Sequence, residues 1–224
     1  MVADKLNNTR YLSHFRSIHR GQYFTEMKTT TVRKLLPEAW GFICPVHTPD
    51  GSPCGLLNHI TLSCAPVASE TSPLKENLNE FKKLCTELGM SPMQTDFNLV
   101  PPHNFLPIMI DGIVLGHVDP AQASAFVDGL RAIKVLQEKS NNKLFAVVPT
   151  TLEIAYLAPG RHTKDAADVK NYYYPGVFLS SQVSRFVRPV QNLQLGEVEW
   201  IGPLEQIILS IACMEEDIRA DSTH

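Results

Sequence analysis

A proline- and glycine-rich stretch constrains the fold of this chain more than any other feature. It covers residues 40–59 and reads WGFICPVHTPDGSPCGLLNH. Its prolines, at positions 45, 49 and 53, fix the backbone φ angle and remove amide donors, so neither a regular helix nor a central strand can pass through it. We therefore expect a stiff, kinked loop between brief buried strands over residues 40–67. Such a loop loses little conformational entropy when it holds a surface against a partner.

The same stretch holds a set of residues that could bind a metal ion. Cys44 and His47 are separated by two residues, and Cys54 and His59 by four. Structural zinc sites more often pair two cysteines or two histidines at short spacing. We therefore interpret the cysteines as structural, and a zinc-binding interaction module is the alternative.

A catalytic thiol is a second alternative for this stretch. Such a thiol must be exposed, must have a lowered pKa and must lie within reach of an imidazole. Cys44 sits in the apolar run FICP, where we expect burial, and Cys54 follows a turn with no activating context. The sequence also contains no G-x-x-x-x-G-K-[ST], G-x-G-x-x-G or G-x-S-x-G motif. The chain on its own therefore does not resemble a catalyst.

Composition narrows the class of protein. The chain has 224 residues, of which 44% are hydrophobic, enough for one large or two small cores. No run approaches the ~20 apolar residues that span a bilayer, and the first residues lack the apolar region of a secretory signal. Five widely spaced cysteines argue against a disulfide framework. We expect a protein of a reducing, intracellular compartment, with no membrane contact.

Charge is distributed unevenly along the chain. Residues 5–34 carry seven basic residues against one acid, Glu26, whereas residues 65–224 carry 13 basic and 19 acidic residues. In residues 5–34, aromatic side chains lie between the basic residues along the sequence. A basic segment on an acidic body indicates either a contact with a polyanion, with phosphate binding and base stacking, or a solvated N-terminal region.

Regular structure is predicted to begin near residue 70. Ser72-Pro73 is a helix start, and apolar residues at helical spacing continue to Leu88. Asp111-Gly112, within 106–118, predicts a β-hairpin. Asp119-Pro120 precedes a second helix. The apolar stripe of that helix is Ala123, Phe126, Val127, Leu130, Ile133 and Leu136.

The last third reads mainly as strands. The runs KLFAVVPTTLEIAYLA, YYYPGVFLSS, VSRFVRPV and EVEWI are rich in β-branched and aromatic residues. Between the first two, residues 160–171 are polar and suit a surface loop. Gly202-Pro203 then opens a terminal helix, LEQIILSIAC. The predicted fold class is α+β: a loop-rich N-terminal segment followed by a mixed α/β domain.

Several of these runs resemble one protein family. SHFR at 13–16, followed by VRKLLPEAWGFICPVHTPDGSPCGLLNHITL at 32–62, resembles the fork region of the second-largest subunit of multisubunit DNA-directed RNA polymerases. Most members carry E-T-P-E-G where this chain has HTPDG, and the HTPDG form is similar to the RNA polymerase I paralogue. SRFVRPV at 184–190 resembles the family's G-R-x-x-R-P-V, with Ser184 in place of glycine. Another polymerase paralogue is the alternative within the family.

The resemblance implies a division of the chain and roles for particular residues. Residues 1–66 would belong to the fork, 67–214 to the external region, and 215–224 to an acidic end. The residues at positions that face nucleic acid are His14, Arg16, Arg20, Lys28 and Arg33. The residues in the loop that lines the active centre are Thr48, Pro49 and Asp50. His47 stands where the family usually has a carboxylate, and the resemblance assigns it no role.

The resemblance also implies partners and a location. The family acts as a nucleotidyltransferase, so we expect the complete enzyme to use Mg²⁺, the fragment alone to be inactive and to bind no cofactor, and no catalytic or metal residue to lie in this segment. The expected partners are the largest subunit, the other polymerase I subunits, the DNA template and the RNA–DNA hybrid. The expected location is the nucleus, and within it the nucleolus, where ribosomal RNA is transcribed.

Overall fold

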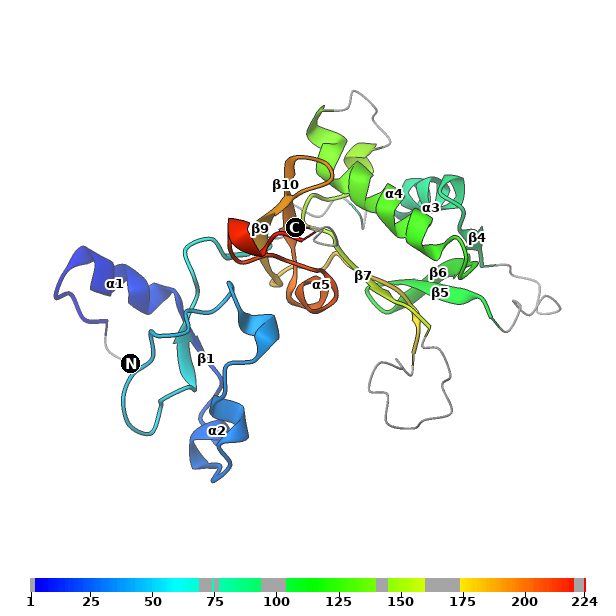
Figure 1. Ribbon diagram of the computed structural model, residues 1–224. Helices are drawn as coiled ribbons and strands as arrows, with labels where there is room; N and C mark the ends of the chain where they lie inside the picture. The colour runs from blue at the N-terminus through cyan, green and yellow to red at the C-terminus, as the bar shows by residue number, and fades with distance from the viewer. Residues whose placement is uncertain are drawn as a thin grey trace.

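The computed structural model describes residues 3–68, 74, 77–93, 104–139, 145–159, 174–219 and 224. Figure 1 shows two connected parts. The N-terminal part, residues 3–64, is coloured blue to cyan, and the body, residues 65–219, contains the larger sheet and the longer helices. Helices and mixed sheets occur together, so the predicted α+β class is confirmed. None of the helices in the described ranges is long and apolar enough to cross a membrane.

A five-stranded sheet forms the centre of the body, in the order β4-β6-β5-β8-β7. Its strands are β4 (Ser91–Pro92), β5 (Leu106–Ile110), β6 (Ile113–Val118), β7 (Glu153–Leu157) and β8 (Gly176–Ser180). Only β5 and β8 pair in parallel, and the other neighbours are antiparallel. Alternate residues of β5 are fully buried, which is the pattern of a sheet with one covered face.

The predicted hairpin at the β5–β6 connection is confirmed. Asp111 and Gly112 have φ angles of 48° and 87°, as a two-residue turn that matches the twist of its strands requires. The Asp111 carboxylate accepts hydrogen bonds from the Ser181 amide at 2.8 Å and from the Ser181 hydroxyl at 2.6 Å. The turn is therefore also tied to the residue that follows β8.

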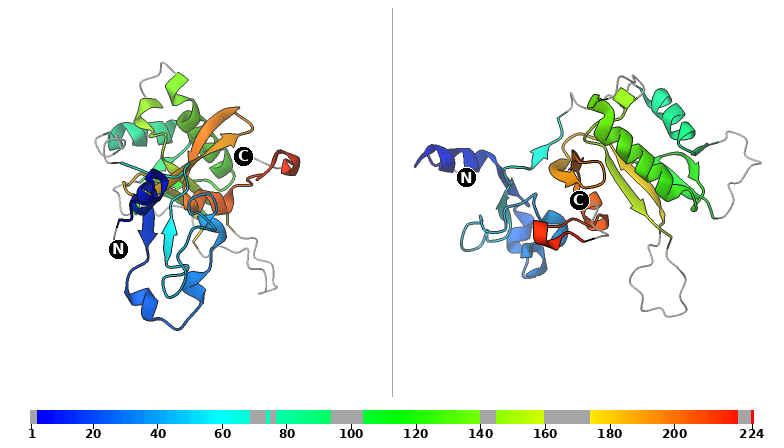
Figure 2. Two further views of the ribbon diagram at one scale, coloured as in Figure 1. Left: turned by 90° about the vertical axis from the view of Figure 1, so that its left-hand side faces the viewer. Right: turned by 45° about the horizontal axis from the view of Figure 1, so that its top comes forward.

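Two helices, α3 (Leu78–Glu87) and α4 (Ala123–Leu136), pack against this sheet, and Figures 1 and 2 show them on the same side of it. The predicted stripe of α4 is buried along most of its length, and Leu136 at its end is half-buried. The expected start of the first helix at Ser72-Pro73 lies outside the described residues, and α3 itself begins at Leu78.

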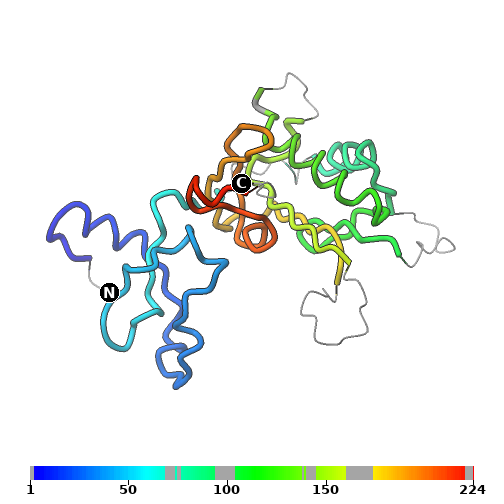
Figure 3. The backbone as a smooth tube through the Cα atoms, in the orientation of Figure 1, coloured from blue at the N-terminus to red at the C-terminus, as the bar shows by residue number. Residues whose placement is uncertain are grey.

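A second, three-stranded sheet joins the body to the N-terminal part, in the order β10-β9-β3. Its strands are β3 (Ala65–Pro66), β9 (Phe186–Asn192) and β10 (Glu197–Ile201), and α5 (Pro203–Ile208) follows. β3 continues directly from the N-terminal part and pairs with β9. The tube in Figure 3 shows this crossing near the middle of the molecule.

Buried charges connect α4 to this second sheet and to α5. Arg131 Nη1 lies 2.6 Å from Glu199 Oε1, and Lys134 Nζ lies 3.0 Å from the same oxygen and 3.3 Å from Glu205 Oε1. Burial alone would raise the pKa of Glu199, but a hydrogen bond from His224 and the charges of Lys134 and Arg131 leave it below its ordinary value. Paired in this way, the buried ions fix the relative placement of α4, β10 and α5.

Two predicted elements are shorter than expected. The run that starts at residue 143 forms a 3₁₀ turn, η6 (Phe145–Val147), and only Glu153–Leu157 is a strand, because Pro149 cannot donate to a ladder. The terminal helix ends at Ile208 rather than Cys213, and Leu209 is extended with ψ of 147°. The polar loop expected at 160–171 lies outside the described residues.

The N-terminal part contains two α-helices, α1 (Asn8–Phe15) and α2 (Tyr23–Glu26), that were not predicted from the sequence. α1 is capped by Asn7, whose side chain accepts from the Arg10 amide at 2.7 Å. The other elements are β1 (Ser17–His19), η1 (Thr31–Arg33), η2 (Pro37–Ala39) and β2 (Leu57–His59). Of the brief strands expected over residues 40–67, the first is reduced to isolated bridges from Trp40 to Ile43 and from Ile43 to Ile60.

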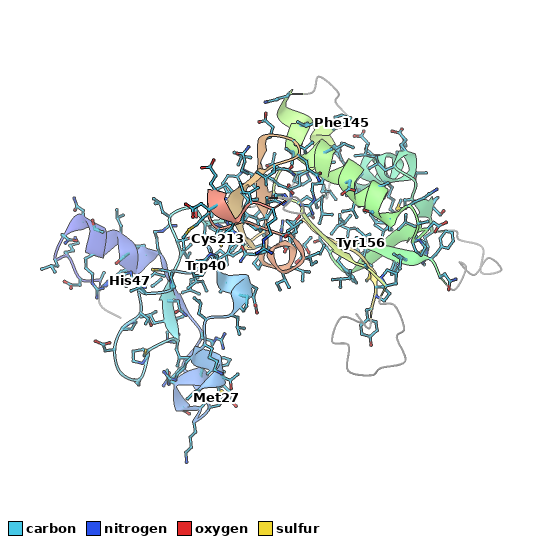
Figure 4. The ribbon with its side chains drawn as sticks, viewed as in Figure 1. Met27, Trp40, His47, Phe145, Tyr156 and Cys213 are labelled. Carbon is cyan, nitrogen blue, oxygen red and sulfur yellow. The ribbon has the colours of Figure 1, made fainter. Side chains whose placement is uncertain are left out.

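The N-terminal part has a small core and depends on the body for support. Within residues 3–64 the buried side chains are Phe42, Leu56, His59 and Cys64. Gln206 of α5 donates from Nε2 to the Trp40 carbonyl at 2.7 Å and accepts from Arg188 Nε at 2.7 Å. Figure 4 labels Trp40 and Cys213 at this junction.

Gly41 is closely packed against the body at the junction. Gly41 has a φ of +80°, and a Cβ there would lie 2.7 Å from Arg188 Nε. The Arg188 guanidinium also lies over the Phe42 ring, 5.7 Å from its centroid. Only glycine has both the backbone conformation and the small size that this contact needs.

Ser184 allows a direct test of backbone strain in the body. Its φ of 67° is in the left-handed region, which costs a non-glycine residue about 1 kcal/mol. We predict that Ser184→Gly raises the free energy of unfolding by about 0.5–1 kcal/mol, measured by urea denaturation. Ser184→Ala, which keeps the Cβ, should give no gain. An unchanged or lowered midpoint for the glycine variant would contradict this reading.

Candidate nucleic-acid interface

The platform loop, residues 45–56, is closed by the side chain of Thr48. Its hydroxyl donates to the Leu57 carbonyl at 2.8 Å and accepts from the Gly55 amide at 2.9 Å. One side chain thus joins the start of the loop to its end. The loop tip stays accessible, since Asp50, Gly51 and Ser52 are exposed.

Arg33 braces the same loop from the side. Its Nη1 donates to the carbonyls of Ser52 and Cys54, both at 2.7 Å. Gly55 passes so close that a Cβ there would lie 2.7 Å from the Arg33 carbonyl oxygen. The resemblance assigned Arg33 to nucleic acid. Its observed hydrogen bonds are to the platform loop and hold that loop in place.

Arg16 also bonds to the chain itself. Its Nη2 donates to the Thr61 carbonyl at 2.5 Å and to the Cys64 carbonyl at 3.2 Å, and the side chain is half-buried. These bonds connect the end of α1 to the segment that leads into β3. The observed contacts give Arg16 a structural role, and its assignment to nucleic acid stays a prediction.

Arg20 and Lys28 are exposed. The Arg20 guanidinium lies over the Phe24 ring at 5.4 Å, a cation–π contact that leaves its edge accessible. Two aromatic side chains on the same part of the molecule, Phe15 and Tyr23, are 67% and 70% exposed. Basic side chains and aromatic rings that are exposed on the same part of a protein are suited to binding nucleic acid. The basic groups bind phosphates, and the rings stack on nucleotide bases.

Two hollows flank the platform loop, and Thr48 lines both. The first, of about 110 Å³, lies between α1 and the loop, and brings His14 together with Thr48 and Pro49. Its lining also includes Arg10, His47, Leu57 and His59. The second, of about 320 Å³, lies on the other side and is lined by Arg20 and Arg33 among others. Five of the predicted site residues thus line one or both of these hollows, whereas Arg16, Lys28 and Asp50 line neither.

Three basic residues of the first hollow, Arg10, His47 and His59, were not among the predicted nucleic-acid-binding residues, and His47 and His59 had been considered only as possible metal ligands. His47 stacks on His59 with ring centroids 3.5 Å apart and planes 4° apart. Burial lowers the pKa of His47 below its ordinary value, and the neighbouring charges of His59, Arg10 and His14 lower it further. The spacing of Arg10 and His14, which places both on one helix face, was a usable signal for part of this group.

The cysteines differ from expectation in one respect. Cys44, expected to be buried, is half-buried, while Cys54 is exposed. Burial raises the pKa of the Cys64 thiol to about 11 and that of Cys85 to about 12, which makes both poor nucleophiles. All five cysteines are described, and all are free thiols.

In the part of the chain that the structure describes, no three His, Cys, Asp or Glu residues could together hold a metal ion.

Comparison with known proteins gives two family matches. Residues 1–65 match a family model described as RNA polymerase Rpb2, domain 3. Residues 115–188 match a second one, described as RNA polymerase I, Rpa2 specific domain. The first match contains the platform loop and both hollows, and the second runs from β6 to β9.

Individual relatives match the chain from end to end. It is 50% identical over 224 residues to the DNA-directed RNA polymerase I subunit RPA2 of Euplotoides octocarinatus, and 44% identical over 225 residues to that of Mus musculus. The identity to the Homo sapiens subunit is 42% over 227 residues. Each alignment covers 100% of this chain and 18% of the relative. The chain belongs to the RPA2 family.

Within the RPA2 family the chain corresponds to a segment, since it spans 18% of the length of these relatives. Its observed backbone accounts for one departure from the pattern of the wider polymerase family. Ser184 stands where glycine is usual, and it adopts the φ of 67° that glycine favours. A glycine at this position would therefore adopt the observed backbone conformation without strain.

Removing the Thr48 hydroxyl should loosen the platform loop. Thr48→Val keeps the shape of the side chain but deletes both hydrogen bonds, and leaves two backbone groups without a partner. We expect a loss of about 1–3 kcal/mol and faster amide hydrogen exchange in residues 48–57, with exchange in β5 unchanged. Thr48→Ser should retain slow exchange. Equal protection in the valine and threonine proteins would show that the hydroxyl does not close the loop.

Proposed function

We propose that this segment, as part of the second-largest subunit of RNA polymerase I, shapes the active-centre cleft and contacts nucleic acid during ribosomal RNA transcription. The nucleic acid would be downstream DNA and the RNA–DNA hybrid. Family membership supports the polymerase assignment. The observation that carries the contact is the platform loop, which is hydrogen-bonded closed, exposed at its tip and flanked by basic side chains.

The complete enzyme would be a nucleotidyltransferase of the nucleus and nucleolus. Its other participants would be the largest subunit, the remaining polymerase I subunits, and Mg²⁺. The described residues of this segment do not fit a magnesium site, because they contain no cluster of three suitable ligands. We therefore assign the segment a positioning role and propose that it is inactive alone.

A closed, proline-rich loop suits this role for a physical reason. Thr48 and Arg33 fix the backbone of the loop, so its tip, with Pro49 and Asp50, occupies one position relative to α1 and β2. A surface that is already ordered loses little entropy when a nucleic-acid strand is placed against it. We propose that the loop holds the strand in register in this way.

The contacts divide the predicted basic residues into three groups. Arg16 and Arg33 each donate to two backbone carbonyls, so their main proposed role is to support the loop. Arg20 and Lys28 are exposed and are the proposed phosphate contacts outside the first hollow. His14 lines that hollow.

The proposal can be tested through the salt dependence of nucleic-acid retention. In assembled RNA polymerase I, Arg20→Gln with Lys28→Gln should reduce the slope of log affinity against log salt by about 1–2, because each phosphate contact releases about one counterion. The measurement is retention of a transcription-bubble scaffold between low and moderate salt. Both side chains are exposed, so the enzyme should assemble normally.

The matched control also removes two positive charges. Lys82→Gln with Lys83→Gln changes α3 in the body, far along the chain from the platform loop. This control should leave the slope unchanged. Equal slopes in the Arg20 and Lys28 variant and in the unmodified enzyme would contradict the proposed phosphate contact.

A further inference from the structure

Four side chains that are positively charged or can bind a proton line the first hollow, between α1 and the platform loop. Arg10 and His14 come from α1, His47 from the loop and His59 from β2. We propose that this hollow binds a single phosphate group and that binding is coupled to protonation of the stacked pair, His47 and His59. The inference rests on the proposed function only for the source of the phosphate.

His59 supplies a buried atom that lacks a partner. The residue is 5% exposed, and its Nδ1 lies 3.1 Å from the His47 carbonyl oxygen. Because a carbonyl oxygen can only accept, this Nδ1 must carry the hydrogen. The other ring nitrogen, Nε2, is buried without a hydrogen-bond partner. Protonation would turn Nε2 into a donor, and because a buried donor without an acceptor is costly, a negative group bound next to the ring would favour the protonated form.

The stacking of His47 on His59 makes protonation depend on an anion. The rings are nearly parallel, with centroids 3.5 Å apart. Two imidazolium ions at this distance repel each other, so a negative group beside them is needed before both can be charged. A phosphate would supply that charge and would accept hydrogen bonds from both rings.

Arg10 and His14 complete the set of donors. His14 Nδ1 accepts from the Asp4 amide at 3.2 Å, so in the neutral ring the hydrogen is on Nε2, which is a donor. Arg10 Nε lies 3.9 Å from the Asp4 carboxylate, and both side chains are about half exposed. Such an exposed pair is weak, and a phosphate can replace the carboxylate as the partner of Arg10. A second carboxylate, that of Asp50, is adjacent in the sequence to Pro49, which lines the hollow.

The size of the hollow restricts the ligand. Its volume is about 110 Å³, room for about four waters, whereas pockets for drug-sized ligands are typically about 300–1,000 Å³. One tetrahedral oxyanion fits this space, and a whole nucleoside does not. The phosphate could come from a nucleic-acid backbone or from a free phosphate ion, and the experiment below separates these sources.

The pH dependence follows from the charges that face His47. Without a ligand, burial and then the positive groups His59, Arg10 and His14 hold the pKa of His47 below its ordinary value. A bound phosphate reverses the sign of the nearby charge and raises that pKa. Binding therefore takes up protons. Phosphate affinity should increase as the pH falls toward and below the ordinary histidine pKa, and decrease as the pH rises.

Histidine hydrogen–deuterium exchange, read by mass spectrometry in assembled RNA polymerase I, measures the pKa of each imidazole. One arm adds inorganic phosphate alone, a second adds an RNA–DNA scaffold, and a third adds the same scaffold with uncharged methylphosphonate linkages. We expect the titration midpoints of His47 and His59 to rise by about one pH unit in an arm that fills the hollow. His117, on β6 in the body, is the control and should not shift in any arm.

Variants link any shift to the hollow. Arg10→Gln, at an exposed position, should reduce the rise at His59 to less than half, and His47→Gln should weaken phosphate binding and flatten its pH dependence. A rise with the charged scaffold supports a backbone phosphate, and a rise with inorganic phosphate alone supports a free ion. No rise with either probe, or an equal rise with the methylphosphonate scaffold, would overturn the phosphate site.

This experiment is separable from the test of the proposed function. If the hollow binds no phosphate, the salt slope that depends on Arg20 and Lys28 can still be present. If that slope is absent while inorganic phosphate shifts His47 and His59, the phosphate site stands and the proposed nucleic-acid contact fails.

Discussion

The hydrogen bonds that close the platform loop are the constraint on which the rest of the site depends. Thr48 connects its two ends, and Arg33 holds two of its carbonyls from outside. Without them, the prolines would restrict single residues but would not define the shape of the whole loop. With them, each hollow has a fixed wall, and His47 is held where it stacks on His59.

The closed loop in turn depends on the body, because the N-terminal part buries few side chains of its own. The β3–β9 pairing, the hydrogen bond from Gln206 to the Trp40 carbonyl and the Arg188 guanidinium over the Phe42 ring attach it to the body, which has the larger hydrophobic core. A functional surface on loops, positioned by a rigid scaffold, is a common arrangement. Here the scaffold is the α+β body, and its Arg188 side chain packs closely against Gly41, whose φ of +80° favours glycine.

Local sequence patterns predicted the regular elements of the body. They did not predict the elements whose structure depends on contacts between residues far apart in the chain. The stripe of α4 and the turn at Asp111-Gly112 could be predicted because periodicity and turn chemistry are properties of neighbouring residues. α1 was missed because its apolar side chains, among them Leu12 and Phe15, are exposed and give no buried stripe.

The same limit applies to the candidate site. The resemblance identified His14, Thr48 and Pro49, which the fold brings together in one hollow. It could not show that Arg16 and Arg33 donate to carbonyls, since the acceptors lie 45 and 19 residues away in the chain. Nor could it show that His59 is buried with one nitrogen lacking a partner, because that depends on its stacking against His47.

Site-specific photo-crosslinking in transcribing RNA polymerase I would show whether the tip of the platform loop lies against nucleic acid. A photoreactive residue would replace Asp50, exposed at that tip, and in a separate enzyme Ile113, exposed at the β5–β6 turn of the body. The account predicts crosslinks to template DNA or to the transcript from position 50 and none from position 113. No crosslink from position 50, or equal yields from the two positions, would contradict it.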